Sequence, residues 1–421
     1  MHRKLLDSAT EALGQVLKLE HPADTVLSAY FRQFPALGQS ERGFVADAVF
    51  GVLRHKRVLD HLTSNGNARR LLLAWLVRFS GSAVGELASV LKASEAESLQ
   101  AIRDAEVDGL PLAVRAELPD WVHERLQLRL SDAEILALGS ALQQAAPLDL
   151  RVNTVKSDRA AVLAALKSRG VSAEATRYSP VGVRLADKPA INRDPLFTGG
   201  AVEVQDEGSQ LIGYLMAPTR HDLVVDFCAG AGGKSLMLGA LMNSQGRVYA
   251  FDISPTRLAR LKPRLKRSGL SNLHPHLLRN EHDPKVKRLA GKIDRVLVDA
   301  PCSGLGTVRR NPDLKFRQSP ESVAEMQAKQ ASILRAASTL VKPGGRLVYA
   351  TCSLLSEENE DIVASFLGKH PEFRPLNCSE LLKQHGIAAE AGEHLRLWPH
   401  IHGTDGFFAA VMERQKNPAA A

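Results

Sequence analysis

Aromatic residues are scarce in this chain, at 5% of 421 positions. So few rings argue against recognition of nucleic-acid bases by broad stacking platforms, which depend on exposed aromatic side chains. Long hydrophobic runs are also missing, since the apolar stretch Leu71–Val77 is far too short to span a bilayer. The N-terminus carries positive charge but lacks the uninterrupted apolar region of a secretory signal. We therefore expect a cytoplasmic protein that does not use a membrane.

Cysteine is equally rare, with four residues at Cys228, Cys302, Cys352 and Cys378. None forms a Cys-x-x-Cys pair, and their wide separation gives no spacing typical of metal ligands. We therefore expect no metal site. Free thiols in a reducing cytoplasm are the simplest interpretation.

Positive charge, by contrast, is abundant. The 54 Lys and Arg residues exceed the 46 Asp and Glu residues by 8, and the isoelectric point is near 9.3. This balance favours a polyanionic partner such as a nucleic acid. The apolar fraction of 44% and the charged fraction of 24% are typical of a soluble globular protein, and the length predicts two or three domains. Nothing in the sequence indicates an extensive apolar interface, so a monomer is expected.

The pattern of apolar residues along the sequence predicts three domains and a tail. Residues 1–138 place apolar side chains at helical spacing without strand-like alternation, which predicts an all-helical domain. Residues 139–210 resemble a small α/β domain of short strands around a helix. Residues 211–416 alternate strand and helix, which predicts a doubly wound, Rossmann-like α/β domain, and residues 417–421 form the tail. Strands of the last domain are expected at Leu223–Phe227, Val248–Asp252, His274–Leu278, Arg295–Asp299, Arg346–Cys352 and, antiparallel, Gly406–Glu413, with helices at Thr256–Arg267, Glu321–Val341 and Glu357–Leu367.

A glycine turn follows the first of these strands, between Asp226 and Ser235. It does not fit the phosphate-binding loop, which needs a glycine where Cys228 stands, and it does not fit the dinucleotide-binding fingerprint. Asp252 ends the second strand, where a carboxylate is placed to accept two hydrogen bonds from a ribose diol. These features favour an adenosyl ligand other than a dinucleotide, and S-adenosylmethionine is the leading candidate.

Two thiols end two consecutive apolar strands, at Cys302 and Cys352. Consecutive strands are often adjacent in such sheets, and ligands bind beyond the carboxyl ends of the strands. Two thiols beside a cofactor indicate covalent chemistry on an electrophilic ring, of which cytosine is the best candidate. Addition of a thiolate to carbon 6 makes carbon 5 nucleophilic toward a methyl group, after which a base removes the carbon 5 proton and the thiolate leaves. Asp299 is expected to hydrogen-bond the amino edge of the cytosine.

The alternative is that both thiols are small buried hydrophobes, the usual fate of free cysteine. Pro301 before one thiol, and Thr351 and Ser353 around the other, favour a pocket instead. Cys228 and Cys378 are interpreted as structural thiols. Basic residues that follow Cys302 are candidates for binding the phosphates next to an extruded or single-stranded base: Arg309, Arg310, Lys315 and Arg317.

Several motifs together resemble the RNA cytosine-C5 methyltransferases of the Sun type. The likeness covers roughly residues 146–414, and residues 1–138 are similar, less distinctly, to the NusB-like RNA-binding domain of the bacterial small-subunit rRNA methyltransferase B branch. The motifs are the turn 226–235, Asp299-Ala-Pro-Cys302-Ser-Gly-Leu-Gly, Arg309-Arg-Asn-Pro312-Asp, Tyr349-Ala-Thr-Cys352-Ser with Glu357-Glu-Asn359, Arg151-Val-Asn153-Thr, Val204-Gln205-Asp206 and Gly406-Phe-Phe, and in the helical domain Ser40-Glu41-Arg42 and Val52-Leu53-Arg54.

The resemblance implies that Cys352 attacks and Cys302 assists product release, whereas a DNA cytosine enzyme would use Cys302 as the nucleophile. It also implies that Arg151 and Asn153 bind RNA. Two departures from the family pattern concern the cofactor: the turn lacks a proline, and no Asp for the adenine is evident after the third strand, where Asn280 or Asp283 stands instead. The cofactor set implied is Cys228, Ala229, Gly230, Ala231, Gly232, Gly233, Lys234, Asp252, Asn280 and Asp299.

The sequence thus predicts S-adenosylmethionine-dependent methylation of carbon 5 of a cytosine in 16S rRNA, free or within an assembling ribosomal particle. The same chemistry on tRNA, a DNA cytosine methyltransferase and a non-catalytic ribosome assembly factor are the alternatives.

Overall fold

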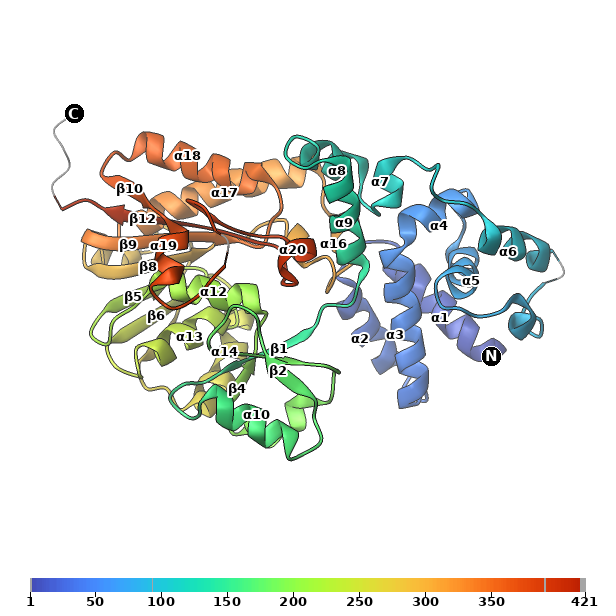
Figure 1. Cartoon of the computed structure of the whole chain (residues 1–421), viewed down its shortest axis with the longest axis horizontal. Coiled ribbons are helices and arrows are strands. Elements are labelled where there is room, and N and C mark those ends of the chain that lie inside the picture. Colours follow the sequence, from blue (N-terminus) through green and yellow to red (C-terminus); the bar gives the residue numbers. More distant parts are fainter. Residues whose placement is uncertain (1, 93, 390, 417–421) are drawn as a thin grey trace. The chain divides into compact units, whose positions relative to one another are not determined.

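The computed structural model describes residues 2–92, 94–389 and 391–416, and the predicted tail 417–421 lies outside them (Figure 1). The chain folds into two compact units. Unit 1 comprises residues 1–145 together with 307–320, and unit 2 comprises residues 146–306 and 321–421.

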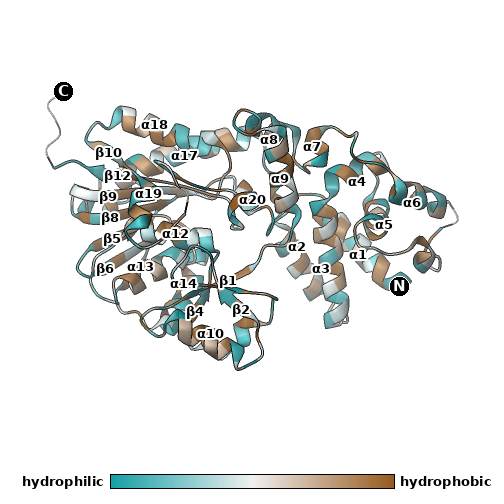
Figure 2. Ribbon diagram, in the orientation of Figure 1, coloured by the Kyte–Doolittle hydropathy of each residue, from teal (hydrophilic) through white to brown (hydrophobic). Residues whose placement is uncertain are grey.

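Unit 1 is all-helical, as the apolar spacing predicts. Its helices carry both apolar and polar residues, visible as brown and teal along the same ribbons in Figure 2, and their apolar sides build one core that includes Leu13, Tyr30 and Leu72. No helix in the described ranges is long and apolar enough to cross a membrane. The helices are α1 Arg3–Val16, α2 Ala23–Gln33, α3 Gln39–Arg54, α4 Lys56–Thr63, α5 Ala68–Arg78, η1 Val84–Leu87, α6 Glu95–Asp104, α7 Leu112–Arg115, α8 Asp120–Leu126, α9 Asp132–Gln143 and α16 Leu314–Arg317.

The segment 307–320 is remote in sequence from the other helices of unit 1 but is bonded to them. A carboxylate oxygen of Asp313 accepts the backbone N–H of Ala23 at the start of α2, at 3.2 Å. Lys315 donates through Nζ to the carbonyl of Arg54 at the end of α3, at 3.0 Å. This segment therefore folds with the N-terminal helices, although in sequence it follows Cys302.

Unit 2 begins with a small antiparallel sheet in the order β2-β3-β1-β4. The short strands expected around a helix are present: β1 pairs with β3, and Val202–Val204 pairs with β1 at the sheet edge. The strands are β1 Leu148–Val152, β2 Ala173–Ala175, β3 Gly182–Leu185 and β4 Val202–Val204, and the helices are α10 Arg159–Lys167, η2 Ile191–Arg193 and α11 Pro195–Thr198.

The larger sheet runs in the order β10-β12-β9-β8-β5-β6-β7, with β11 paired to β12. Strands β5 to β9 pair with one another in parallel, and β12 is antiparallel to β9, as predicted. The strands are β5 Leu223–Asp226, β6 Arg247–Asp252, β7 Leu273–Leu277, β8 Ile293–Asp299, β9 Val341–Thr351, β10 Phe373–Leu376, β11 Leu395–Leu397 and β12 Phe407–Arg414.

Both faces of the larger sheet are covered by helices, which makes it doubly wound. Val224 packs with α12, α13, α14 and α19 on one face, while its neighbour Val225 packs with α15, α17 and α18 on the other, and Figure 1 shows α17 and α18 on the side opposite α12 and α13. Burial on both faces explains the continuous apolar runs of these strands. The helices are α12 Glu207–Met216, α13 Gly233–Leu241, α14 Pro255–Ser268, α15 Pro284–Arg288, η3 Leu305–Thr307, α17 Pro320–Ser338, η4 Ser356–Glu358, α18 Glu360–Lys369, α19 Cys378–Lys383 and α20 Pro399–His402.

Candidate active site

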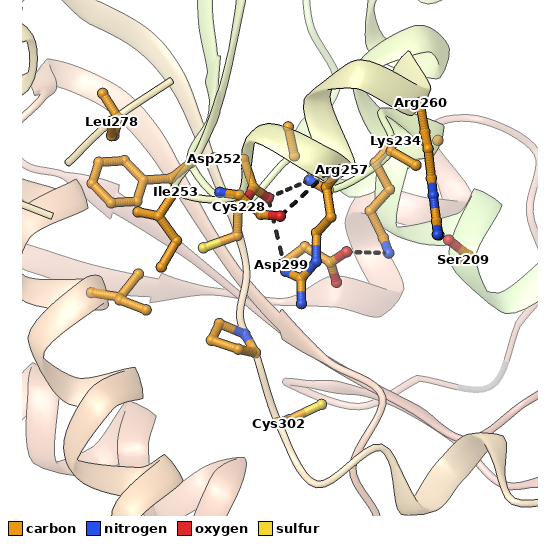
Figure 3. A pocket seen from close by; sticks show the side chains of 18 of the residues that line it. Ser209, Cys228, Lys234, Asp252, Ile253, Arg257, Arg260, Leu278, Asp299 and Cys302 are labelled. Atoms are coloured by element: carbon orange, nitrogen blue, oxygen red, sulfur yellow. Dashed lines mark hydrogen bonds and ion pairs between the residues drawn. The ribbon is translucent and has the colours of Figure 1, made fainter. Parts of the chain in front are cut away.

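A cavity of about 840 Å³ opens at the carboxyl edge of the larger sheet, where β5, β6 and β8 end (Figure 3). This volume and position are typical of a small-molecule site in an α/β sheet. Residues of the glycine turn, the ends of β6 and β8, and α14 and α17 line it: Cys228, Ala229, Gly230, Ala231, Gly233, Lys234, Asp252, Ile253, Ser254, Arg257, Arg260, Arg264, Asp299, Pro301, Cys302, Met326, Lys329 and Ile333.

The glycine turn needs glycine for two different reasons. Gly230 has a φ of +56°, and a Cβ there would meet no atom within 4 Å, so the side that faces the cavity is open. Gly232 has a φ of +81°, and a Cβ there would lie 2.1 Å from a methyl carbon of Leu261. Although the turn lacks the expected proline, the N–H of Gly232 bonds the carbonyl of Ala229 at 2.8 Å, and the N–H of Ala229 bonds that of Phe251 at 2.8 Å.

Asp252 lies at the end of β6, 4% exposed, and joins the glycine turn to the start of α14. One carboxylate oxygen accepts the N–H of Gly230 at 2.8 Å, and the other accepts the N–H of Ser254 at 2.7 Å. A carboxylate has about four lone-pair positions, so each oxygen keeps one for a ligand hydroxyl. The geometry is compatible with the predicted recognition of a ribose diol.

Lys234 and Asp299 form an ion pair across the cavity, with 2.7 Å between Nζ and Oδ2 (Figure 3). Burial lowers the pKa of Lys234, but the attraction of Asp299 and their hydrogen bond outweigh burial, so that its pKa is raised overall. Lys234 also lies over the ring of Phe407, 5.4 Å from its centroid. The lysine is therefore held as a cation beside the carboxylate that ends β8.

Asp226 ends β5 behind the turn and does not line the cavity. It is 1% exposed, and Oδ2 accepts the hydroxyl of Ser235 at 2.6 Å. Burial raises the pKa of Asp226 to about 7. This carboxyl group supports the turn from within.

The two thiols predicted to act together lie together. β8 and β9 pair in parallel, with Asp299 opposite Ala350, so that the loops after both strands leave the same edge. The Sγ atoms of Cys302 and Cys352 are 3.4 Å apart, and each residue is partly exposed. Their hydrogen bond, together with burial, raises the pKa of Cys302, which therefore keeps its proton more firmly.

The other two thiols have different surroundings. Cys228 lines the cavity, and burial together with nearby carboxylates raises its pKa. Cys378 is fully buried in the core of unit 2, where burial raises its pKa to about 11, and its Sγ lies 3.7 Å from the carbonyl of Ala409. Neither environment favours a thiolate.

Two residues predicted to bind RNA are buried within unit 2 and make internal hydrogen bonds there. Arg151 is 2% exposed and donates to the carbonyl of Gly233 at 2.6 Å and to the side chain of Gln205. Asn153 is 3% exposed, and its amide donates to the carbonyls of Gly200 and Ser268, both at 2.9 Å. Arg151 braces the start of α13, and Asn153 braces the end of α14.

Residues of the segment 309–317 that were predicted to contact phosphates are also partly or fully buried. Lys315 is 2% exposed within unit 1, 3.9 Å from a carboxylate oxygen of Glu117, and Arg309 is 6% exposed. Burial raises the pKa of Glu117 and lowers that of Lys315, because each charge has lost most of its water. Arg310 is half-buried. Lys315 is therefore an internal residue of unit 1.

The residues predicted to contact the adenine do not line the cavity. Asn280 is exposed, does not line the cavity, and accepts the N–H of His282 at 2.9 Å. Asp283 caps α15 through the N–H of Lys285. Leu278 and Glu281, which follow β7, line the cavity instead. Glu281 is the residue directly after the predicted Asn280.

Further residues that line the cavity were not predicted from the sequence. Gln205 belongs to a motif of the family resemblance, and Ser209 follows it by one helical turn. Arg257 and Arg260 stand out only as members of a basic run. Met326 and Lys329 reach the cavity from α17, and no local pattern signals this, because their position depends on how that helix packs.

Comparisons with known proteins agree with this architecture. Residues 213–413 match the family model described as 16S rRNA methyltransferase RsmB/F, and residues 118–192 match the ferredoxin-like domain of RsmF/B-like methyltransferases. The chain is 31% identical to the Probable ribosomal RNA small subunit methyltransferase B of Synechocystis sp., over 96% of this chain and 97% of that protein. It is 35% identical to the ribosomal RNA small subunit methyltransferase B of Sodalis glossinidius, over 70% of this chain and 66% of that protein.

Solved structures share the fold. The crystal structure of PH0851 superposes with a TM-score of 0.80 at 26% identity, over 98% of this chain and 99% of that one. NSun6 from Pyrococcus horikoshii with SFG superposes with a TM-score of 0.63 at 20% identity, over 71% of this chain and 99% of that one, which shows the fold alone. Together with the Rossmann-like sheet and the near full-length relatives, the family model confirms the predicted membership: the chain belongs to the 16S rRNA methyltransferase RsmB/F family, and it is a methyltransferase.

Proposed function

We propose that this methyltransferase transfers a methyl group from S-adenosylmethionine to carbon 5 of a cytosine in small-subunit rRNA. The observation that carries the proposal is the pair of thiols, with Sγ atoms 3.4 Å apart, at the ends of β8 and β9. Only Cys302 of the two lines the cavity, so one thiol faces the cofactor site and its neighbour adjoins it.

The residues around the cavity fit S-adenosylmethionine. The open side of Gly230 accommodates close approach of a ligand, and the free lone pairs of Asp252 suit a ribose diol. When bound, the cofactor supplies an electrophilic methyl group. The structure of NSun6, which shares this fold, was solved with SFG, an analogue of S-adenosylmethionine.

In the proposed reaction, Cys352 as a thiolate adds to carbon 6 of the target cytosine, which makes carbon 5 nucleophilic. Asp299, held by Lys234, accepts a hydrogen bond from the amino group of the ring. After carbon 5 is methylated, its proton is removed and the bond between carbon 6 and Cys352 breaks, which restores the thiolate. Cys302, whose Sγ lies 3.4 Å from that of Cys352, assists this release.

Small-subunit rRNA is proposed as the substrate because the near full-length relatives are named for it and because the net charge is +8. Unit 1 is proposed to bind RNA as a NusB-like domain, on free rRNA or an assembling particle in the cytoplasm. In unit 2, exposed cations on α14 replace the buried ones as candidate phosphate contacts: Arg257, Arg260, Lys262 and Lys266.

The test is bisulfite sequencing of total RNA from cells with and without the gene, and from cells that carry only a Cys352→Ala version. Loss of one protected cytosine in small-subunit rRNA in the last two samples is the expected result. Loss in tRNA alone would overturn the substrate and retain the chemistry. No lost position in any RNA would contradict the proposal and favour a DNA substrate or a non-catalytic assembly factor.

A further inference from the structure

A fully buried carboxylate, Glu358, lies behind the two thiols. It ends the short helix η4 between β9 and α18 and is 0% exposed. A charged group without contact to water is costly unless donors surround it. The hydrogen-bond partners of Glu358 therefore indicate its role.

The carboxylate of Glu358 bonds to both thiol loops. Ser303, directly after Cys302, donates its backbone N–H to Oε1 at 2.7 Å and its hydroxyl to Oε2. Ser353, directly after Cys352, donates its hydroxyl to the same Oε2. One side chain is thus bonded to the residue next to each sulfur.

A second residue completes this arrangement from α17. The amide nitrogen of Gln330, itself fully buried, donates to Oε1 of Glu358 at 3.0 Å and to the carbonyl of Pro301 at 2.9 Å. Among the described residues, four donor groups thus bond to the two carboxylate oxygens: the N–H and hydroxyl of Ser303, the hydroxyl of Ser353 and the amide nitrogen of Gln330. Glu358 is also fixed through its backbone, since its carbonyl accepts the hydroxyl of Tyr349 at 2.6 Å.

We propose that Glu358 is a positioning residue, which acts through Ser303 and Ser353 to hold Cys302 and Cys352 at the separation that the reaction needs. The inference rests on the proposed function for the role of the thiols, but the geometric claim stands apart from it. Glu358 touches neither sulfur in these contacts, so it is not a catalytic residue. Removing one of its acceptor oxygens should change the separation of the two sulfur atoms before it changes cofactor or RNA binding.

The decisive variant is Glu358→Gln. The amide has nearly the same shape, but one of its ends donates instead of accepting, so at least one of the serine or glutamine donors loses its acceptor. We expect kcat to fall roughly 10- to 100-fold, because small misplacements of reacting groups have effects of that size. The KM for RNA and the Kd for S-adenosylmethionine should stay within about twofold, because binding does not depend on the separation of the thiols. Glu325→Gln, at an exposed carboxylate of α17, is the matched control and should behave as the wild type.

A second readout needs neither RNA nor cofactor. Phenylarsine oxide bridges two neighbouring thiols: two arsenic–sulfur bonds form, and the oxygen leaves as water with both thiol protons. We expect the wild type and Glu325→Gln to bind it tightly, Cys302→Ala to lose this binding, and Glu358→Gln to bind at least about tenfold more weakly.

The two readouts separate the possible failures. If Glu358→Gln melts at a lower temperature but keeps the wild-type kcat and arsenical affinity below that temperature, the residue is only structural and the inference is overturned. If the wild type methylates no RNA, the proposed function fails, and the arsenical comparison still decides the geometric claim. Should Glu358→Gln not fold, the Ser303→Ala/Ser353→Ala double variant removes both hydroxyl donors, and wild-type values in both assays would equally refute the inference.

Discussion

The Sγ atoms of Cys302 and Cys352 lie 3.4 Å apart although 50 residues separate them in sequence. The parallel pairing of β8 and β9 brings their loops to one edge, and the N–H of Gly306 bonds the carbonyl of Cys352 at 2.8 Å. A Cβ at Gly306 would lie 2.8 Å from that same oxygen, so the close approach of the loops depends on glycine there. Two thiols at this separation suit one ring, with one sulfur bonded to it and the other beside it.

Replacement of Cys352 by alanine should abolish methyl transfer, because carbon 5 of cytosine stays unreactive without addition at carbon 6. The measurement is incorporation of labelled methyl groups into small-subunit rRNA from a strain that lacks the gene. Cys378→Ala, which removes a buried thiol away from the cavity, is the control and should retain turnover. Near-normal turnover of the Cys352 variant would refute its role as the nucleophile.

Replacement of Cys302 by alanine should leave RNA covalently attached to the protein, because addition proceeds while release is impaired. A denaturing gel should show a slowly moving adduct that disappears after digestion with ribonuclease. The Cys302→Ala/Cys352→Ala double variant should form none. Intact turnover without any adduct would remove Cys302 from the mechanism.

Replacement of Lys315 by methionine should destabilise unit 1 rather than weaken a phosphate contact. The variant leaves the buried carboxylate of Glu117 without its cation, a change that costs roughly 3 kcal/mol in the free energy of unfolding. Denaturant unfolding measures this, with the exposed Lys262→Met as control. Unchanged stability combined with weaker RNA binding would reinstate Lys315 as an RNA contact.

The stability of unit 2 should depend on pH through Asp226. Its pKa is about 7 in the folded protein against 3.8 in the unfolded chain, so the folded state binds more protons between these values. The contribution of Asp226 to stability is therefore complete below about pH 3.8 and is lost as the pH rises through 7.

The isosteric Asp226→Asn variant removes the charge that is buried above pH 7. It should raise the free energy of unfolding at pH 8 by roughly 1–3 kcal/mol and should show little gain at pH 4.5. Urea unfolding of the ligand-free protein at both values measures the difference. A gain of equal size at the two pH values would show that the titration of Asp226 is not its cause.

Local patterns predicted much of the fold. The continuous apolar runs identified β5, β6, β8 and the end of β9, because strands buried on both faces need such runs. The alternation of strand and helix identified the doubly wound sheet. Where the prediction differed, the reason is also local: the helix expected at Glu357 begins at Glu360, since Ser356–Glu358 forms a separate tight turn.

The sequence by itself determined which reactive side chains stand at the ends of the strands. Asp252 and Asp299 end strands, and the two thiols follow strands, that apolar runs identify in the sequence. Parallel strands bring their carboxyl ends to one edge of the sheet. Tertiary structure alone decided which polar residues stay accessible. Arg151 and Lys315 carry charges typical of RNA contacts, yet their partners, Gly233 and Glu117, come from distant parts of the chain. The fate of a charged side chain depends on such long-range partners, and the same is true of Glu358, which reaches both thiol loops only in the folded protein.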